Sequence, residues 1–331
     1  MSKRIITLGE VMMRLSTTGH ERFFQTRDYE VQYGGAEANV AVSLAFWGQS
    51  VAHICAFPDN EIGKAANAYL RSTGIDTTFI QKRPGRMGLY FFEGGAMQRA
   101  SKIIYDRAYS AFSEFDGEGV DWDRVFEGAD WFHWTGITPA ISDAAAKLTI
   151  KALEAAQKHG VKVSGDINYR RNLWQYGKGP LEVMPELIQH TQVIIAGLTD
   201  MQNCMDIHEE DYVTACQNAK AKFPSITHIV TTERQSMSSS HNVLSGMLWN
   251  GKQLLHSRSY DMPNIVDRVG GGDAFMAGLI YGLLNNSDHE ALEFAVAASV
   301  LKHSIPGDVN YVSLEEVEDL VKGENVGKLL R

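Results

Sequence analysis

Three consecutive glycines and an aspartate, Gly270-Gly271-Gly272-Asp273, stand directly before an apolar segment that extends to Leu284. Glycine lets backbone amides converge where a side chain would obstruct them. The apolar segment predicts a helix that begins at once, and the positive end of its dipole favours a bound anion. A carboxylate at the mouth of such an anion hole can accept a proton from the group that attacks the anion. The pattern favours phosphoryl transfer over a simple capped turn.

The composition is that of an ordinary globular protein. The chain has 331 residues, 44% of them apolar and 21% charged, which suits one large α/β domain or two domains. No apolar run approaches the roughly 18 residues of a membrane helix, and no signal peptide is recognisable. The three cysteines lack metal-ligand spacing and fit a reducing compartment. We therefore expect a soluble, cytoplasmic protein without membrane partners.

The net charge of −9 disfavours broad electrostatic binding to nucleic acid or anionic lipid. It also limits how an anionic substrate is attracted, because the overall field of the protein repels it. Attraction then depends on a few locally placed cations and backbone amides.

Short apolar runs alternate with helical patterns over most of the chain, which predicts a mostly parallel central sheet flanked by helices. The expected strands are residues 5–9, 51–56, 131–134, 161–166, 193–196 and 228–232. The helices with the clearest ends are residues 36–47, 60–73 and 142–159, each followed directly by glycine.

Two segments interrupt the alternation, residues 12–33 and 87–107. Both have polar-apolar strand patterns with glycine turns and no helix, so they predict a small separate β-sheet. A sheet of this kind often acts as a lid that excludes water from a site. A flap used only for dimerisation is the alternative, and the two roles are compatible.

Three further groups of residues carry polar chemistry. Gly34-Gly35 precede a helix on whose first turn Asn39 can bond a hydroxyl. Asn168 and Arg170 follow a strand, at the sheet edge where open α/β sheets bind ligands. There Arg170 either neutralises a substrate anion or pairs with the nearby Asp166. In the segment 87–107, Tyr90, Tyr105 and Arg107 can face a pocket, or they are simply solvated. Arg107 and Arg170 each carry a planar guanidinium group suited to a carboxylate.

Other mononucleotide and hydrolase patterns are missing from the sequence. It has no P-loop, no Gly-x-Gly-x-x-Gly after the first strand and no Gly-x-Ser-x-Gly elbow. The histidines show no His-x-x-x-His spacing, which argues against a structural metal site.

The early glycine cluster and the late Asp267 to Asp273 motif resemble the two signatures of the ribokinase-like (PfkB) carbohydrate kinases. The resemblance covers nearly the whole chain and also includes residues 105–107, 166–170 and 303–308. It implies a ribokinase-like α/β fold as a single kinase domain over residues 1–331. Segments 12–33 and 87–107 would form a β-lid over the sugar site.

The resemblance implies ATP-dependent phosphorylation of the C6 hydroxyl of 2-dehydro-3-deoxy-D-gluconate, with Mg²⁺ bridging the nucleotide phosphates. Asp273 is then the base, and the amides of the three glycines stabilise the phosphoryl charge. The implied sugar-acid contacts are Gly34, Gly35, Asn39, Tyr90, Tyr105, Arg107, Arg170 and Asp273. The implied nucleotide contacts are Asn168, Thr232, Glu233, Gly270 and Gly272. The family also suggests a homo-oligomer, either a dimer or a larger assembly.

An acidic substrate is also favoured by the residues themselves. Ribose, fructose and adenosine carry no carboxylate and would leave two desolvated arginines uncompensated, whereas a keto-deoxy acid forms charge-assisted bonds with one or both.

Two motifs depart from the family pattern. Its Asn-x-x-Glu, which organises Mg²⁺ and its waters, is replaced by Gly197-Leu198-Thr199-Asp200, so Asp200 takes the place of the glutamate and would act on the metal through water. The usual Gly-x-x-Gly turn after the strand ending near Thr232 reads Glu233-Arg234-Gln235-Ser236.

The alternatives are therefore a kinase for another sugar or a catalytically silent sugar-binding regulator. The other sugars are fructose, 2-keto-3-deoxygalactonate and a 5-keto-deoxy sugar acid. Asp273 argues against a silent protein, because a binding module has no use for a base there.

Overall fold

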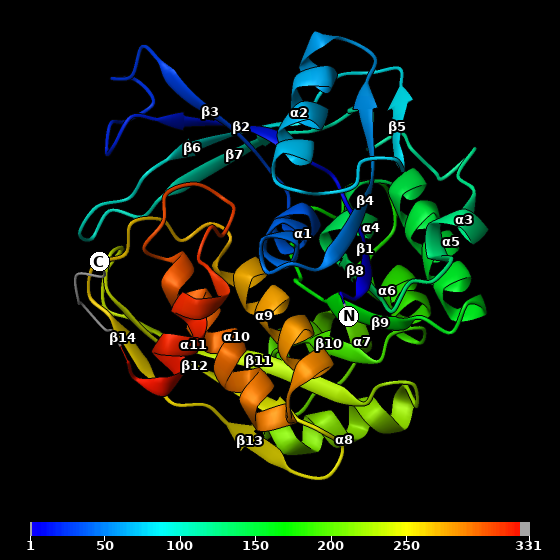
Figure 1. Ribbon diagram of the computed structural model, residues 1–331, viewed down its shortest axis with the longest axis vertical. Coiled ribbons are helices and arrows are strands. Elements are labelled where there is room, and N and C mark those ends of the chain that lie inside the picture. Colours follow the sequence, from blue (N-terminus) through cyan, green and yellow to red (C-terminus); the bar gives the residue numbers. More distant parts are fainter. Residues whose placement is uncertain (1, 325–331) are drawn as a thin grey trace.

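A ten-stranded sheet forms the centre of the protein, whose computed structural model describes residues 2–324 (Figure 1). In sheet order the strands are β13 (Leu254–His256), β12 (Asn242–Trp249), β11 (His228–Ser236), β10 (Val193–Ile195), β9 (Lys162–Asp166), β8 (Trp131–Thr135), β1 (Arg4–Leu8), β4 (Ser50–Pro58) and β5 (Ile80–Arg83), and β14 (Tyr260–Met262) pairs with β12. Neighbours from β11 to β5 are parallel, whereas β12 pairs antiparallel with β11, β13 and β14. The expected α/β class is confirmed.

Helices cover both faces of this sheet. They are α1 (Ala36–Phe46), α2 (Glu61–Ser72), α3 (Trp122–Phe126), α4 (Ile137–Ile141), α5 (Asp143–Lys158), α6 (Pro180–Ile188), α7 (Leu198–Met205), α8 (Tyr212–Lys222), α9 (Gly271–Asn285), α10 (Asp288–Lys302) and α11 (Leu314–Lys322). Helices α1, α9 and α10 lie together in front of the sheet in Figure 1. The three helices expected with clear ends are confirmed, and the glycines after them, Gly48, Gly74 and Gly160, have φ values of 77°, 89° and 66°.

The core lies between the helices and the central strands. Ile5, Ile6 and Leu8 of β1 are fully buried, as are Trp131 and Trp134 of β8. Both strands are inside a parallel sheet covered on its two faces, which explains why consecutive residues of each strand are buried instead of alternate ones. Cys55, Cys204 and Cys216 are buried free thiols. No helix within residues 2–324 is long and apolar enough to cross a lipid bilayer.

A second, four-stranded sheet stands off this core at the upper left of Figure 1. We call it the flap sheet; its order is β3 (Tyr29–Gly34), β2 (Met12–Thr17), β6 (Leu89–Glu93) and β7 (Lys102–Asp106). Strand β2 pairs antiparallel with β3 and parallel with β6, so the two interrupting segments of the sequence form one sheet. The prediction of a small separate sheet is confirmed.

One expected boundary is wrong. Strand β11 is expected over residues 228–232, but it continues to Ser236. The added residues pair antiparallel with β12, with Glu233 opposite Ser245 and Ser236 opposite Asn242. The segment contains neither glycine nor proline, and a long partner strand supplies backbone bonds for it, so the chain does not turn there.

Candidate active site

The glycine triplet forms the first turn of α9, and its three glycines have different surroundings. Gly270 has a φ of 80°, and a Cβ on it would lie 1.8 Å from the carbonyl oxygen of Asp308. A Cβ on Gly271 would lie 2.5 Å from Cε1 of His303, whereas Gly272 faces open space. Side chains are therefore excluded at two positions by the segment that passes beneath the turn.

The same turn presents unbonded amides. The amide of Ala274 donates to the carbonyl of Gly270 at 2.8 Å, which is the first helical bond of α9. The amides of Gly272 and Asp273 precede it and have no acceptor within the helix. Because they lie at the positive end of a fifteen-residue helix, they can stabilise an anion above the triplet.

Asp273 lies at the mouth of this anion hole and has a specific partner. Asn39 donates from Nδ2 to Oδ2 of Asp273 over 2.6 Å, which joins the first turns of α1 and α9. Burial raises the pKa of Asp273 to about 7, with contributions from Asp308 and Glu37, while the Asn39 bond and the charge of Lys302 oppose the rise. A carboxylate with a pKa near neutrality is suited to act as a general base.

Gly34 and Gly35 accommodate other parts of the protein. A Cβ on Gly34 would lie 2.1 Å from Oδ2 of Asp308, and one on Gly35 would lie 1.9 Å from the carbonyl oxygen of Glu10. The amide of Gly35 also donates to Asn39 at 3.3 Å. The early glycine cluster thus allows the junction of β3 and α1 to approach both Asp308 and the backbone at Glu10.

Arg107 follows β7 and is bound to a buried carboxylate. Its Nε and Nη2 lie 2.8 and 2.6 Å from Oε2 of Glu10, whose other oxygen accepts from Ser110 at 2.5 Å. Glu10 follows β1 at the centre of the main sheet. The pair therefore fixes one edge of the flap sheet over the carboxyl ends of the central strands.

Tyr90 and Tyr105 lie opposite each other on β6 and β7, with ring centroids 5.9 Å apart. Tyr90 is buried and its hydroxyl donates to Asp308, whereas half of the Tyr105 side chain is exposed. The two tyrosines have therefore different surroundings, and only Tyr105 presents its side chain to solvent.

Asp166 ends β9 and is the second carboxyl in the site with a raised pKa. Burial raises the pKa of Asp166 to about 8, and the charges of Asp200 and Asp273 add to the rise while Arg170 opposes it. Asp166 and Arg170 do not form the direct ion pair considered from the sequence, and Arg170 is exposed. Asn168, with a φ of 42°, donates to Asp166 at 3.3 Å.

Asp200 caps the start of α7. Its Oδ2 accepts from the amide of Gly197 and its Oδ1 from the amide of Tyr169, both at 2.9 Å. Thr232 and Glu233 are exposed on β11, beyond the parallel part of the sheet. The electrostatic coupling of Asp200 to Asp166 places these two carboxylates in one site.

Sequence reasoning did not identify a buried network that joins the flap sheet to the anion hole. Arg14 on β2 donates from Nη1 to Asp308 at 2.6 Å and from Nη2 to Asp267 at 2.8 Å. Asp267 also accepts from the amides of Gly307 and Val269, both at 3.0 Å. The only indication in the sequence is that Arg14 is charged at a position of β2 where the polar-apolar alternation predicts a buried side chain.

Comparison with known proteins supports one family. The model of the pfkB family carbohydrate kinases matches residues 2–312. A 2-dehydro-3-deoxygalactonokinase of Haloferax volcanii is 29% identical over 99% of both chains. A 2-dehydro-3-deoxygluconokinase from Thermotoga maritima, known from its crystal structure, shares 40% sequence identity with this chain. The two structures superpose with a TM-score of 0.91 over 97% of this chain and 100% of that one.

The fold extends to more distant kinases. A fructokinase of Xylella fastidiosa with bound ATP is 20% identical, with a TM-score of 0.81 over 98% of this chain and 99% of that one. This likeness shows the ribokinase-like arrangement of sheet, flanking helices and small separate sheet expected from the sequence. The chain belongs to the pfkB family of carbohydrate kinases.

Proposed function

We propose that this sugar kinase uses ATP to phosphorylate the C6 hydroxyl of a 2-keto-3-deoxy sugar acid, with 2-dehydro-3-deoxy-D-gluconate as the first candidate. The observation that carries the proposal is the bond between Asn39 and Asp273 at the mouth of the anion hole. It holds one carboxylate, with its pKa near 7, where a sugar hydroxyl must lie to attack a phosphoryl group bound to the α9 amides.

In the proposed reaction Asp273 accepts the proton of the C6 hydroxyl. The sugar oxygen forms a bond to the γ-phosphorus of ATP, the bond from that phosphorus to the bridging oxygen breaks, and ADP leaves with the electron pair. The amides of Gly270, Gly271 and Gly272 are assigned to the transferring group, where they stabilise the charge on its oxygens together with the amide of Asp273. The Gly271 amide also donates to the carbonyl of Arg268 at 3.4 Å, so the free amides of Gly272 and Asp273 contribute most. Asn39 keeps the carboxylate in position and favours its ionised form.

The sugar acid is assigned to the space between the flap sheet and α1. Arg107 and the exposed Arg170 supply the cations for its carboxylate, and Tyr105 supplies an accessible hydroxyl. Arg107 already compensates the charge of Glu10, so the substrate carboxylate shares this guanidinium rather than replacing its partner. Gly34, Gly35 and Tyr90 shape the same space; Tyr90 does so through its bond to Asp308.

The residues present fit a magnesium ion held partly by water. No group of three or more His, Cys, Asp or Glu side chains within residues 2–324 is arranged to hold a metal. Mg²⁺ usually binds one or two carboxylates together with substrate phosphates and waters. Asp166 is the last residue of β9, and burial together with the charges of Asp200 and Asp273 raises its pKa, so a bound cation would favour its ionised form. Asp166 and, through water, Asp200 would hold the ion, which would neutralise the nucleotide phosphates.

The nucleotide is assigned to the opposite side of the anion hole from the sugar. The proposed nucleotide contacts lie at one edge of the main sheet: Asn168 just after β9, and Thr232 and Glu233 on β11. Only β10 separates these two strands, as expected for residues that contact one nucleotide. Thr232 and Glu233 are exposed and Asn168 is half-buried, which leaves all three accessible to a ligand. The flap sheet is proposed to act as the lid of a single kinase domain, and the homo-oligomer expected from the sequence remains a prediction.

A second candidate substrate is 2-keto-3-deoxygalactonate, because the relative from Haloferax volcanii is a 2-dehydro-3-deoxygalactonokinase. The two sugar acids differ in the configuration at one hydroxyl and share the carboxylate, the keto group and the C6 hydroxyl. The same anion hole and arginines therefore serve either one.

The test is ADP release with the two 2-keto-3-deoxy acids, a 5-keto-deoxy acid, fructose and ribose. We expect kcat/KM to be highest for one of the two 2-keto-3-deoxy acids. Arg107→Ala should reduce kcat/KM for the acids by about 10²-fold or more, equivalent to losing a charge-assisted contact of roughly 3 kcal/mol. Arg86→Ala is the matched control, because Arg86 pairs with Asp106 at the outer edge of the flap sheet. Equal losses on acid and neutral sugars would reject the carboxylate contact, and preference for fructose or ribose would reject the substrate class.

A further inference from the structure

Lys302, the last residue of α10, is fully buried although it carries an ammonium group. Its Nζ donates to the carbonyl oxygen of Ile305 at 3.0 Å. Within residues 2–324 it makes no direct ion pair with a carboxylate. A buried lysine without such a partner is costly to the fold, so its position calls for an explanation.

Lys302 lies beneath the anion hole. Its Cε is 3.2 Å from the point that a Cβ on Gly270 would occupy, and the next residue, His303, lies under Gly271. Ser299, one turn earlier on α10, donates to the carbonyl of Gly271 at 2.8 Å. The carboxyl end of α10 thus forms the floor under the amino end of α9, and the ammonium group stands at the meeting point of the two helices.

The charges around Lys302 favour its ionised form. Burial lowers the pKa of Lys302, but Asp267, Asp308 and Asp273 oppose that effect, and only Arg14 adds to it. Burial likewise lowers the pKa of His303, with further lowering from Lys302 and two arginines, which favours the neutral form of His303. The positive charge of the floor therefore comes from Lys302.

We propose that Lys302 is a positioning residue that places a positive charge under the anion hole, where it retains the phosphoryl group during transfer and favours the ionised form of Asp273. Backbone amides carry only partial charges, whose effect falls off within the first turn of a helix. A full charge in a water-poor site acts over a longer range. The inference rests on the proposed roles of the α9 amides and Asp273.

A purely structural role is the alternative, since lysine is common at helix ends and bonds their carbonyls. The two roles differ in their effect on pH dependence. The groups that act on Asp273 are Asn39 and Glu37 from α1, Asp166 from β9, Asp308 from the loop after α10, and Lys302. Of these, Lys302 is the only cation, so removing its charge shifts the ionisation of Asp273 to higher pH.

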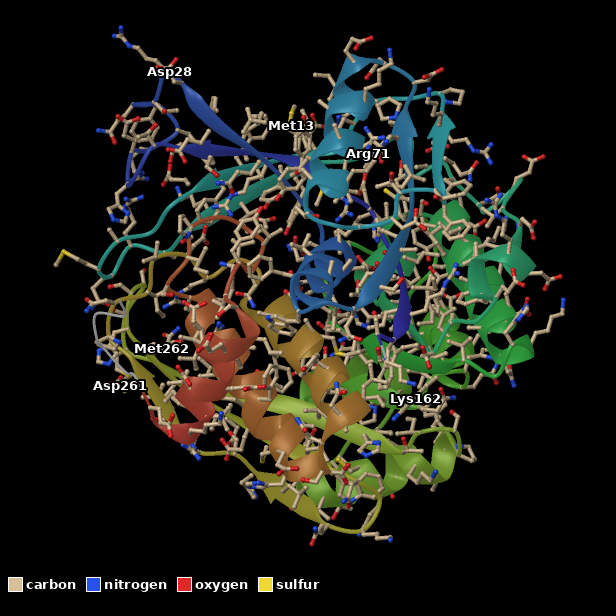
Figure 2. The ribbon with its side chains drawn as sticks, viewed as in Figure 1. Met13, Asp28, Arg71, Lys162, Asp261 and Met262 are labelled. Carbon is tan, nitrogen blue, oxygen red and sulfur yellow. The ribbon has the colours of Figure 1, made fainter. Side chains whose placement is uncertain are left out.

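The experiment compares Lys302→Met, which keeps the packing of the stem, with Lys302→Ala, which vacates the position of the ammonium. The control is Lys162→Met. Lys162 is half-buried against the ring of Trp131 at 4.6 Å, and burial lowers its pKa as well. It lies at the opposite end of β9 from Asp166, far from Met13 and Asp28 of the flap region in Figure 2.

For Lys302→Met we expect a loss of kcat of about 10²-fold, as for the removal of one anion-hole donor. The acid limb of the kcat profile should move up by about one pH unit. Ammonium chloride should restore part of the activity of Lys302→Ala but none in Lys302→Met, whose side chain fills the space; choline chloride serves as the ionic-strength control. Lys162→Met should keep both rate and profile.

An unchanged pH profile in folded Lys302→Met, or no rescue of folded Lys302→Ala, would overturn the proposal. Failure of Lys302→Met to fold would also overturn it, because the ammonium group would then serve the fold. A measurement of ATP hydrolysis without sugar separates this inference from the proposed function. It uses the same anion hole, so an effect of Lys302→Met on it supports the inference even if no sugar acid is turned over.

Discussion

Arg14 donates to Asp267 over 2.8 Å, although the two residues are 253 positions apart in the sequence. Arg14 is on the flap sheet, and Asp267 lies in the loop between β14 and α9 that leads into the anion hole. Both side chains are buried, with exposed fractions of 3% and 6%. The flap sheet and the loop that leads into the anion hole are therefore joined by one shared ion pair, which Asp308 extends through its own bond to Arg14.

Replacing Arg14 with methionine should destabilise the protein, because Asp267 and Asp308 would remain buried without their cation. Breaking a buried ion pair in this way costs about 3–5 kcal/mol. We expect a lower midpoint of urea unfolding and a lower kcat/KM for the sugar. The exposed Arg71 on α2, labelled in Figure 2, provides the control Arg71→Met, which should change neither quantity. A stable and fully active Arg14→Met protein would show that the flap is positioned by other contacts.

Asp273→Asn should keep the fold and lose the reaction. Asparagine can still accept the hydrogen bond from Asn39, but it cannot take up a proton, so kcat should fall by roughly 10²–10⁴-fold. Single-turnover phosphorylation measures the chemical step directly. Asp261→Asn, at an exposed position of β14, is the matched control. Residual activity of Asp273→Asn above about a tenth of the original would remove Asp273 from the role of base.

The kcat of the unaltered enzyme should rise with pH through about 7 and then level off, because Asp273 acts in its ionised form and has a pKa of about 7. Burial is the main cause of that raised pKa, and the bond from Asn39 lowers it. Asn39→Ala should therefore move the acid limb of the profile to higher pH. A limb that stays in place or moves to lower pH would contradict the assignment of this pKa.

Asp166→Asn should stabilise the metal-free protein while weakening catalysis. The pKa of Asp166 is about 8 in the folded protein against an ordinary value of 3.8, so its carboxyl prefers to be protonated in the fold. That contribution to stability is complete below pH about 4 and is lost as the pH rises through 8. The melting temperature of Asp166→Asn relative to the unaltered chain should therefore increase from pH 5 to pH 8 in EDTA.

The same variant should require more Mg²⁺ for half-maximal activity if Asp166 holds the ion. Thermal melts with and without Mg²⁺ separate the two effects. A melting difference that does not depend on pH would reject the raised pKa of Asp166, and an unchanged Mg²⁺ requirement would reject its role toward the metal.

The sequence predicted those features that depend on neighbouring residues. Gly270 to Asp273 form a local turn, so the anion hole was recognisable from their order alone. The alternation of short apolar runs with helices likewise predicted the sheet, because strand and helix periods are local properties. The flap strands were recognisable from their polar-apolar alternation and the lack of a helix.

What could not be predicted depends on residues that meet only after folding. The need for glycine at position 270 comes from the carbonyl of Asp308, and the burial of Arg14 comes from two distant carboxylates. The extension of β11 to Ser236 depends on pairing with β12 rather than on its own sequence. No periodicity in a single segment reports such long-range contacts.

The flap sheet is therefore a poor candidate for exchange between relatives as an independent module. Arg14 and Tyr90 belong to it by sequence, yet their side chains end on Asp308, whose backbone carbonyl also determines the turn at Gly270. A chimaera that imports a flap for another sugar must import these two contacts with it, or redesign the residues around Asp308. Changes of substrate in this protein are thus constrained by the same residue that shapes the turn at Gly270.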